Sequence, residues 1–234
     1  MMASLQSVVF DFDGVIADSE PLHLRAFQQT LGEEGIELSA ADYYSRYLGY
    51  DDVGLVQAIA ADRGLAISGP QISALVTRKG TKLQEMLRGG HVLFPGAVEF
   101  IRCAAAEVPI AIASGALRQE IVEIIEAAGV ADLFATIVAA GDTPRSKPSP
   151  APYLLAFERL RQHSGRDLDP SRCVAIEDSR WGIESARGAG LRCVGVTNSY
   201  AAADLQTAEL VVSGLDVLTL PALDRLCAID PRTV

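Results

Sequence analysis

Near its amino terminus the chain contains the stretch Val8-Val9-Phe10-Asp11-Phe12-Asp13-Gly14. The run of β-branched and aromatic residues predicts a buried strand, and the acids and glycine that follow predict its end. The pattern recurs where Ile110–Ala113 leads into Ser114-Gly115 and where Val174–Ile176 leads into Glu177-Asp178. Because the carboxyl ends of parallel strands form one edge of a sheet, these polar residues are expected to converge there.

Strand and helix patterns alternate along most of the chain. Strands are predicted at residues 6–11, 108–114, 135–140, 172–177, 192–197 and 209–213. Helices are predicted at Leu117–Ala128, ended by Gly129, at Ala151–Gln162, and at Arg180–Arg187, with Ser179 as N-cap. This alternation implies right-handed crossovers, so we predict an α/β fold with a Rossmann-like core and a mostly parallel sheet.

Residues 18–92 interrupt the alternation. Helical patterns cover Leu22–Leu31, Ala40–Tyr47, Val53–Arg63 and Gln71–Arg88, and no convincing strand pattern occurs among them. We therefore predict an α-helical cap domain at residues 18–92, inserted into an α/β catalytic core of residues 1–17 and 93–234. Ala17-Asp18 and Gly89-Gly90 are the expected hinges of this cap. The alternative is a helical layer fused to the sheet.

The composition narrows the classes of function. The chain has 234 residues, 49% of them hydrophobic, which suffices for one or two ordinary cores. A formal charge of −10 without a basic run disfavours nucleic acid as a partner. No apolar run reaches transmembrane length and no signal peptide is evident, so we expect a soluble cytoplasmic protein, monomeric or weakly dimeric. Cys103, Cys173, Cys193 and Cys227 form no CxxC pair and are predicted to be small buried residues.

Asp11 and Asp13 lie two residues apart after the first strand. In an extended chain they would point to the same side, and Gly14 would let the backbone turn sharply. Two carboxylates so close repel each other, so a divalent cation or a shared proton is expected. One could be a nucleophile and metal ligand while the other transfers protons. The alternative is an Asx-turn or a helix-capping pair.

Ser114, Gly115 and Lys147 are candidates for binding an anion. The Ser114 hydroxyl and the N–H groups after it would stand at the positive end of the next helix, although a plain N-cap has the same geometry. Lys147 lies in a proline-rich loop that could fix its ammonium in place. A lysine ~4 Å from an anion contributes roughly 4 kcal/mol at an effective dielectric of about 20. The alternative is a solvated lysine, and Asp142 and Arg145 in the same loop are interpreted as a salt-bridge pair or turn residues.

Glu177 and Asp178 stand at the end of another buried strand. Adjacent acids at such a place favour a metal site, because Mg²⁺ prefers oxygen ligands. Neighbouring strand residues point to opposite faces, so only one is expected to bind the metal directly. Asp178 is the preferred direct ligand. Glu177 is expected to support the ligands without touching the metal, or to bind the metal through a water molecule. Helix capping by Asp178 or Ser179 is the alternative.

The motifs follow one another in the order Asp-x-Asp-Gly, Ser-Gly, Lys-Pro-x-Pro and Glu-Asp-Ser. In this order they resemble the haloacid dehalogenase superfamily, and the match spans nearly the whole chain. The longest matching stretches are Asp11–Pro21 and Ile176–Ile183. They resemble the subgroup with a helical cap after the first motif, which includes sugar-phosphate phosphatases and β-phosphoglucomutase.

The resemblance implies that Asp11 attacks phosphorus and becomes an aspartyl phosphate. Asp13 would protonate the leaving oxygen and then activate water, while Ser114 and Lys147 would hold the phosphoryl oxygens. Magnesium would be bound by Asp11, by the main-chain carbonyl of Asp13 and by Asp178. Haloacid dehalogenases themselves need no acid at the place of Asp13, so its presence favours phosphate chemistry.

The resemblance extends into the cap. His23 and Lys79 fall where β-phosphoglucomutase has a histidine and a lysine near the sugar. Taken alone, His23 would be a helix-surface or core histidine and Lys79 a solvated charge. The mutase holds its second phosphate with a cap arginine, and Asp52 falls at that place here. An acid cannot bind that phosphate, which disfavours a mutase, although Lys79 or Arg118 could supply the missing cation.

The sequence therefore predicts a magnesium-dependent phosphatase that acts on a small phosphorylated metabolite of the sugar-phosphate type. A β-phosphoglucomutase-like phosphomutase is the alternative, because it shares the first half-reaction. A non-catalytic binding module on the same fold is a third interpretation, but binding alone would not need both Asp11 and Asp13.

Overall fold

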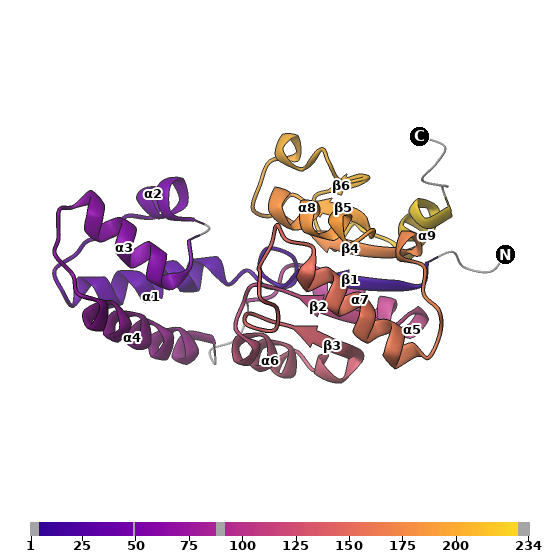
Figure 1. Ribbon diagram of the computed structural model, residues 1–234, viewed down its shortest axis with the longest axis horizontal. Coiled ribbons are helices and arrows are strands. Elements are labelled where there is room, and N and C mark those ends of the chain that lie inside the picture. Colours follow the sequence, from indigo (N-terminus) through magenta and orange to yellow (C-terminus); the bar gives the residue numbers. More distant parts are fainter. Residues whose placement is uncertain (1–4, 49, 88–91, 229–234) are drawn as a thin grey trace. The chain divides into compact units, whose positions relative to one another are not determined.

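The computed structural model describes residues 5–48, 50–87 and 92–228 (Figure 1). Contacts along the chain divide it into two compact units, one of Met1–Asp18 with His91–Val234 and one of Ser19–Gly90. The chain leaves the first unit after Ala17 and returns to it before Leu93. These two residues lie side by side, because they pair in an isolated bridge. The expected hinge at Gly89-Gly90 lies outside the described residues.

A parallel sheet of six strands forms the centre of the first unit, in the order β3-β2-β1-β4-β5-β6. The strands are β1 Ser7–Phe10, β2 Ile110–Ala113, β3 Phe134–Val138, β4 Cys173–Glu177, β5 Arg192–Val196 and β6 Leu210–Val212. Every residue of β1, β2 and β4 is buried, as is typical of parallel strands covered on both faces. The predicted α/β fold with a Rossmann-like core is confirmed, and each predicted strand is present.

Helices pack on both faces of this sheet. They are α5 Ala97–Glu107, α6 Arg118–Ala127, α7 Ala151–Ser164, α8 Arg180–Gly188 and α9 Leu220–Ala228, with 3-10 turns η2 Ala131–Leu133, η3 Pro170–Arg172 and η4 Ala202–Leu205. Val9 of β1 shares a hydrophobic cluster with Tyr153 of α7. The next residue, Phe10, meets Phe100 of α5 edge to face at 6.1 Å between ring centres. Successive residues of β1 therefore contact helices on opposite faces.

Strand β1 lies between β2 and β4, and this position determines where the site forms. Phe10 pairs with Ile112 on one side and with Ile176 on the other. The residues that follow these three in sequence therefore reach the same carboxyl edge. The chain runs outward from β1 through β2 and β3, then returns to the other side of β1 as β4. Such a reversal of strand order is where ligands bind in open α/β sheets.

The described residues of the second unit form helices joined by turns and loops, with no strand among them. It contains α1 Glu20–Gly32, α2 Ala40–Asp42, the π-helical turn η1 Tyr43–Tyr47, α3 Asp52–Asp62 and α4 Gly69–Leu87. Phe27, Tyr43 and Ile59 belong to its hydrophobic core. The helix predicted over residues 40–47 is a short α-helix capped by Ser39 that widens into the π-helical turn. The predicted end of the last helix at Arg88 lies outside the described residues.

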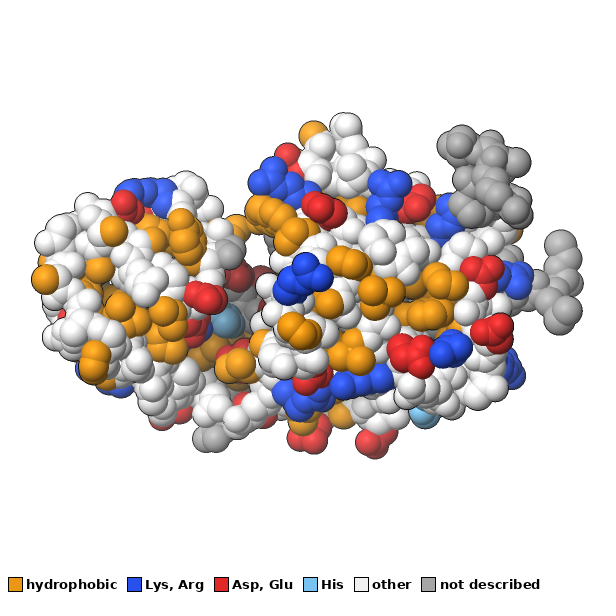
Figure 2. Space-filling model, viewed as in Figure 1, with side chains coloured by type: hydrophobic (Ala, Val, Ile, Leu, Met, Phe, Trp, Pro, Cys, Tyr) orange, Lys and Arg blue, Asp and Glu red, His pale blue; other side chains and the backbone are white. Residues whose placement is uncertain are grey.

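Three of the four cysteines are buried as predicted, but Cys103 is exposed. The buried residues of α5 are Ala97, Phe100, Ile101 and Ala104, and Cys103 lies off this stripe. On the face of the α/β unit in Figure 2, acidic and basic side chains are interspersed among apolar ones. Among the helices of the described residues, none combines the length and apolarity that a membrane span requires.

Candidate active site

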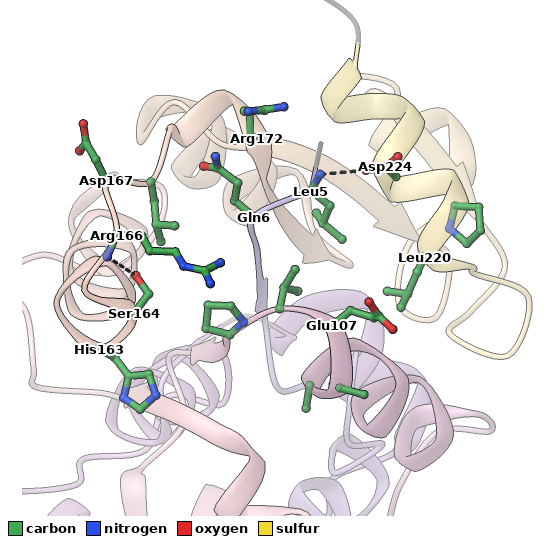
Figure 3. A pocket seen from close by; sticks show the side chains of 16 residues that line it. Leu5, Gln6, Glu107, His163, Ser164, Arg166, Asp167, Arg172, Leu220 and Asp224 are labelled. Atoms are coloured by element: carbon green, nitrogen blue, oxygen red, sulfur yellow. Dashed lines mark hydrogen bonds between the residues drawn. The ribbon is translucent and has the colours of Figure 1, made fainter. Parts of the chain in front are cut away.

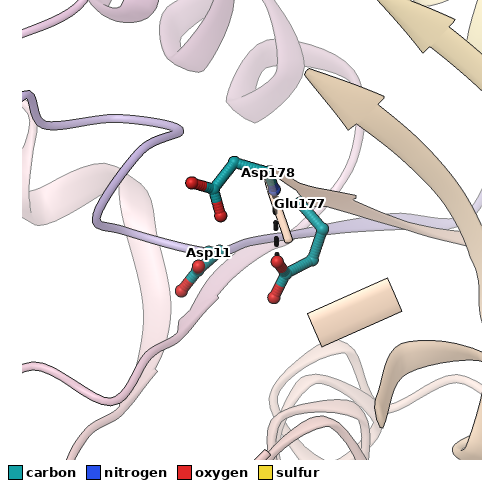
Figure 4. A group of neighbouring side chains, drawn as sticks. All are labelled: Asp11, Glu177 and Asp178. Carbon is teal, nitrogen blue, oxygen red and sulfur yellow. Dashed lines mark hydrogen bonds between the residues drawn. The ribbon is translucent and has the colours of Figure 1, made fainter. Parts of the chain in front are cut away.

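Three carboxylates come together at the carboxyl edge of the sheet (Figure 4). Asp11 directly follows β1, Glu177 is the last residue of β4, and Asp178 comes next. The Asp11 N–H donates to the carbonyl of Ile176 at 2.9 Å, which extends the pairing of the two strands by one residue. All three acids are buried, and one oxygen of each lies within 4.8 Å of the others.

Lys147 adds a positive charge to this group. Its Nζ lies 2.7 Å from Oδ1 of Asp11 and 2.6 Å from Oε1 of Glu177. Burial lowers the pKa of Lys147, but the charges of Asp11 and Glu177 outweigh burial and raise the pKa above its ordinary value. The ammonium therefore stays charged at neutral pH. With only 15% of its side chain exposed, Lys147 is not the solvated loop lysine of the alternative.

The buried acids need a counter-charge. Burial raises the pKa of Asp11 well above its usual value, and the charge of Glu177 raises it further. Burial, followed by the charge of Glu177, also raises the pKa of Asp178 to about 7. A divalent cation would offset both penalties, and carboxylate oxygens are the donors that Mg²⁺ prefers. The donor set of Asp11, Asp178 and the adjoining Glu177 therefore fits a magnesium ion.

The loop after β1 turns sharply at Gly14, whose φ is 78°. A Cβ at this position would overlap the carboxylate of Asp178 and crowd the Ser199 hydroxyl, so the close approach requires glycine. Nδ2 of Asn198 donates to the Gly14 carbonyl at 2.8 Å and holds the loop. Asp13 lies in the same loop, half-buried, and its charge contributes to the raised pKa of Asp178.

Ser114 and Gly115 form a turn between β2 and α6. The Ser114 side chain is buried, and its hydroxyl accepts a hydrogen bond from the N–H of Ala116 at 3.0 Å. Helix α6 begins only at Arg118, with Leu117 in the N-cap position. Ser114 is therefore not the N-cap, and that alternative is wrong, because the hydroxyl closes a local turn before the helix starts. Gly115 is exposed in this turn.

Arg118, a predicted substrate ligand, has partners in the loop after β3. Its Nη2 lies 2.5 Å from Oδ2 of Asp142 and 3.0 Å from the carbonyl oxygen of Ile137. Arg159 approaches the same Asp142 oxygen at 3.4 Å. Among the described residues, Asp142 thus pairs with these two arginines and not with Arg145, so the suggested Asp142–Arg145 pair is wrong.

In the helical unit, Lys79 contacts both His23 and Asp52. Nζ of Lys79 lies 2.8 and 2.9 Å from the two carboxylate oxygens of Asp52 and 2.9 Å from Nδ1 of His23. Lys79 is only 1% exposed, so it is not a solvated charge. Burial, and then the charge of Lys79, lower the pKa of His23 to about 3. Because an ammonium can only donate, neutral His23 accepts at Nδ1 and carries its proton on Nε2.

Three contributors to the site were missed in the sequence. The Ser199 hydroxyl hydrogen-bonds to Asp178, and Asn198 binds the loop at Gly14. Both follow β5, so the rule that polar residues after a strand mark the site could have found them. The Tyr153 hydroxyl donates to Glu177 at 2.8 Å. Its position on the buried stripe of α7 gave no signal beyond an ordinary core residue.

A cavity of about 1150 Å³ lies elsewhere in the α/β unit (Figure 3). Gln6, Pro109 and Arg172 line it, each just before a strand of the sheet. The cavity is therefore at the amino edge of the sheet, opposite the carboxylates. Charges of both signs line it, among them Arg166 and Glu107, and none of the predicted site residues does.

Comparison with known proteins agrees with this geometry. A model of the family described as haloacid dehalogenase-like hydrolase matches residues 5–190. Protein CbbY of Rhodobacter capsulatus is 33% identical over 210 residues, which cover 86% of this chain and 88% of that protein. Fructose-1-phosphate phosphatase YqaB of Escherichia coli (strain K12) is 28% identical over 189 residues, covering 81% of this chain and 95% of that protein.

A solved structure is also similar to this chain over most of its length. The crystal structure of CbbY from Rhodobacter sphaeroides in complex with phosphate has a TM-score of 0.81 at 25% identity. The similarity covers 94% of this chain and 99% of that one. The match of the family model to most of the chain includes all four motifs in full, the last of them, Glu177-Asp178-Ser179, near its end. The chain therefore belongs to the haloacid dehalogenase-like hydrolase family.

Proposed function

We propose that this protein is a magnesium-dependent phosphatase that hydrolyses a small phosphorylated metabolite of the sugar-phosphate type through an aspartyl phosphate. The observation that carries the proposal is the Lys147 ammonium 2.7 Å from Asp11. A cation fixed beside a nucleophilic carboxylate can neutralise the oxygens of the phosphoryl group under attack. The similarity to fructose-1-phosphate phosphatase of Escherichia coli supports the substrate class.

Asp11 and Asp13 divide the chemistry between them. In the first half-reaction an Asp11 oxygen attacks phosphorus, the bond from phosphorus to the ester oxygen breaks, and Asp13 gives its proton to that oxygen. In the second, Asp13 takes a proton from water, whose oxygen attacks phosphorus and frees Asp11. Ser114, the N–H group of Gly115 and Lys147 bind the phosphoryl oxygens.

Magnesium, when bound, would neutralise charge on the phosphoryl oxygens and on the carboxylates. Asp11 and Asp178 are its proposed side-chain ligands, and the main-chain carbonyl of Asp13 is a third. The raised pKa values of both acids support this choice, because two buried carboxylates need a counter-charge to stay ionised. Glu177 already accepts a hydrogen bond from Lys147, which supports an indirect role for it.

The helical unit is proposed to act as a cap, with His23 and Lys79, and Arg118 from the core, as further substrate ligands. Hydrolysis is preferred over phosphomutase activity because Asp52 matches the charge of Lys79. A second phosphate therefore gains little from this cluster. We still expect the protein to be a monomer or a weak homodimer and to be located in the cytoplasm.

Release of inorganic phosphate from a panel of phosphorylated metabolites, with magnesium or with excess chelator, tests the proposal. Asp11→Asn should lower turnover at least ~1000-fold, because a carboxamide cannot serve as the anionic nucleophile. The temperature of thermal unfolding of this variant should not fall below that of the wild type. Asp132→Asn removes an exposed acid from the same unit and should keep full activity. No phosphate release from any panel member, or near wild-type turnover in Asp11→Asn, would refute the proposal.

A further inference from the structure

Tyr153 of α7 is completely buried and contacts the candidate active site. Its hydroxyl donates to Oε1 of Glu177 at 2.8 Å, and the same oxygen accepts a hydrogen bond from Nζ of Lys147 at 2.6 Å. The Lys147 ammonium also lies 5.1 Å from the centre of the Tyr153 ring, within the range of a cation–π attraction. Tyr153 therefore acts on Lys147 both directly and through Glu177.

Both oxygens of Glu177 are engaged. Oε2 accepts from the N–H groups of Asp178 and Ser179, at 3.2 and 3.3 Å, and from the Ser179 hydroxyl at 3.1 Å. Glu177 is fully buried, and a Cβ on Gly182 would overlap its carboxylate. A carboxylate offers about four lone-pair sites, so these donors, together with Lys147 and Tyr153, saturate it. Glu177 is thus built to hold hydrogen bonds.

We infer that Tyr153 is a positioning residue for phosphoryl transfer, acting through Glu177 to fix the Lys147 ammonium beside Asp11. This inference rests on the proposed function, in which Lys147 binds the phosphoryl oxygens. An ammonium has three N–H donors at fixed angles. Asp11 and Glu177 take two of them, at 2.7 and 2.6 Å, and this sets the direction of the third.

The phenol hydroxyl of Tyr153 helps to fix the position of the Glu177 carboxylate relative to the Lys147 ammonium. Without it, Oε1 would have one donor instead of two, and the carboxylate and ammonium could shift together. A displacement of about 1 Å in a catalytic group can cost roughly 100-fold in rate. Tyr153→Phe removes this hydroxyl while it keeps the ring and every charge, so its effect reports orientation.

Tyr47→Phe is a matched control for Tyr153→Phe. Tyr47 is also buried, and its hydroxyl donates to a carboxylate oxygen of Asp62 at 2.7 Å, but it belongs to the helical unit. For Tyr153→Phe we expect kcat to fall about 10- to 100-fold. Affinity for orthovanadate, measured by calorimetry with magnesium present, should fall with it. The magnesium concentration for half-maximal activity should stay unchanged, and Tyr47→Phe should match the wild type in all three.

The outcomes separate positioning from general destabilisation. Wild-type kcat and vanadate affinity in Tyr153→Phe would overturn the inference, as would a loss of magnesium affinity as large as the loss of vanadate affinity. If Tyr153→Phe does not fold, Glu177→Gln takes its place and should show the same selective loss of vanadate affinity. A wild-type protein that binds vanadate but hydrolyses no phosphate ester would refute the proposed function alone, because vanadate affinity still reports the position of Lys147.

Discussion

Glu177 and Asp178 are neighbours in the sequence, but their carboxylates have different surroundings. Glu177 is fully buried and accepts from Lys147, Tyr153 and the turn that starts α8. Asp178 is 6% exposed, and its carboxylate lies against Gly14 and the Ser199 hydroxyl. Asp178 therefore keeps acceptor capacity for a cation, whereas the oxygens of Glu177 are already used.

Alanine at position 178 should weaken magnesium binding more than alanine at position 177. Asp178→Ala removes a proposed metal ligand, so the magnesium concentration for half-maximal activity should rise by more than about 10-fold. Glu177→Ala should mainly lower kcat at saturating magnesium, since Lys147 loses a partner. Titration of chelator-treated protein with magnesium measures both effects. The reverse ranking would refute the choice of ligand, and full wild-type activity in excess chelator would refute the metal requirement.

The strand-end motifs could be predicted because they interrupt apolar runs with polar residues. For that reason the sequence indicated Asp11, Ser114 and Glu177, together with the strands that lead to them. Lys147 was indicated instead by its proline-rich loop. Tyr153 could not be predicted in the same way, because an aromatic residue on the buried stripe of a helix has the pattern of a core residue whether or not its hydroxyl binds an acid. The alternative that Ser114 caps α6 was wrong for a similar reason, since a serine after a strand can close a turn as well as cap a helix.

Gly182 in the first turn of α8 is expected to be needed for the position of Glu177. A Cβ there would overlap the buried carboxylate, so Gly182→Ala should cost about 1–3 kcal/mol of unfolding free energy and lower activity. Gly80→Ala in α4 is the control, because beyond its chain neighbours and the backbone of its own helix the added carbon would meet nothing within 4 Å. That change should stabilise the protein by about 0.5–1 kcal/mol through its helix propensity. Urea unfolding and activity measure both, and equal effects would contradict the overlap.

His23 should make the helical unit less stable in acid. Its pKa is lowered from 6.5 to about 3, by burial and then by Lys79, so below pH 6.5 the unfolded chain binds a proton that the folded one does not. The contribution of neutral His23 to the free energy of unfolding is thus fully present above pH 6.5 and is lost as the pH falls toward 3. The loss near pH 5 should be about 2 kcal/mol, at 1.36 kcal/mol per pH unit.

Urea unfolding of the wild type and of His23→Gln at pH 7.5 and pH 5 measures this loss. The glutamine carbonyl can still accept from Lys79, so the variant should fold and show a smaller loss than the wild type. His163→Gln, which replaces an exposed histidine in the other unit, should keep the wild-type difference. The same difference in His23→Gln as in the wild type would contradict this assignment.

The charge of the whole chain makes local cations necessary. With a formal charge of −10, the protein repels an anionic substrate at long range. Lys147 and a bound magnesium ion would have to overcome this repulsion within the site itself. A substrate with two phosphates would need a further cation for the second one.

The motion of the helical unit as a lid stays a prediction.

The protein should hydrolyse its substrate rather than isomerise it. A mutase reorients a bisphosphate intermediate, so it needs a cation for the phosphate outside the reaction centre. In the helical unit, the Lys79 ammonium is held by both oxygens of Asp52, 2.8 and 2.9 Å away, and the pair carries no net charge. The Asp52 side chain remains 34% exposed, so its carboxylate would repel a phosphate dianion and offers it no donor.

Phosphorus NMR of β-glucose 1-phosphate with magnesium and a trace of the 1,6-bisphosphate distinguishes the two reactions. We expect free phosphate to appear faster than glucose 6-phosphate. Asp52→Asn removes the carboxylate charge beside Lys79, so it should increase the rate with a bisphosphate relative to a monophosphate, whereas Asp132→Asn should leave that ratio unchanged. Glucose 6-phosphate that appears much faster than free phosphate would identify a mutase, and Lys79 would then have to bind the second phosphate despite Asp52.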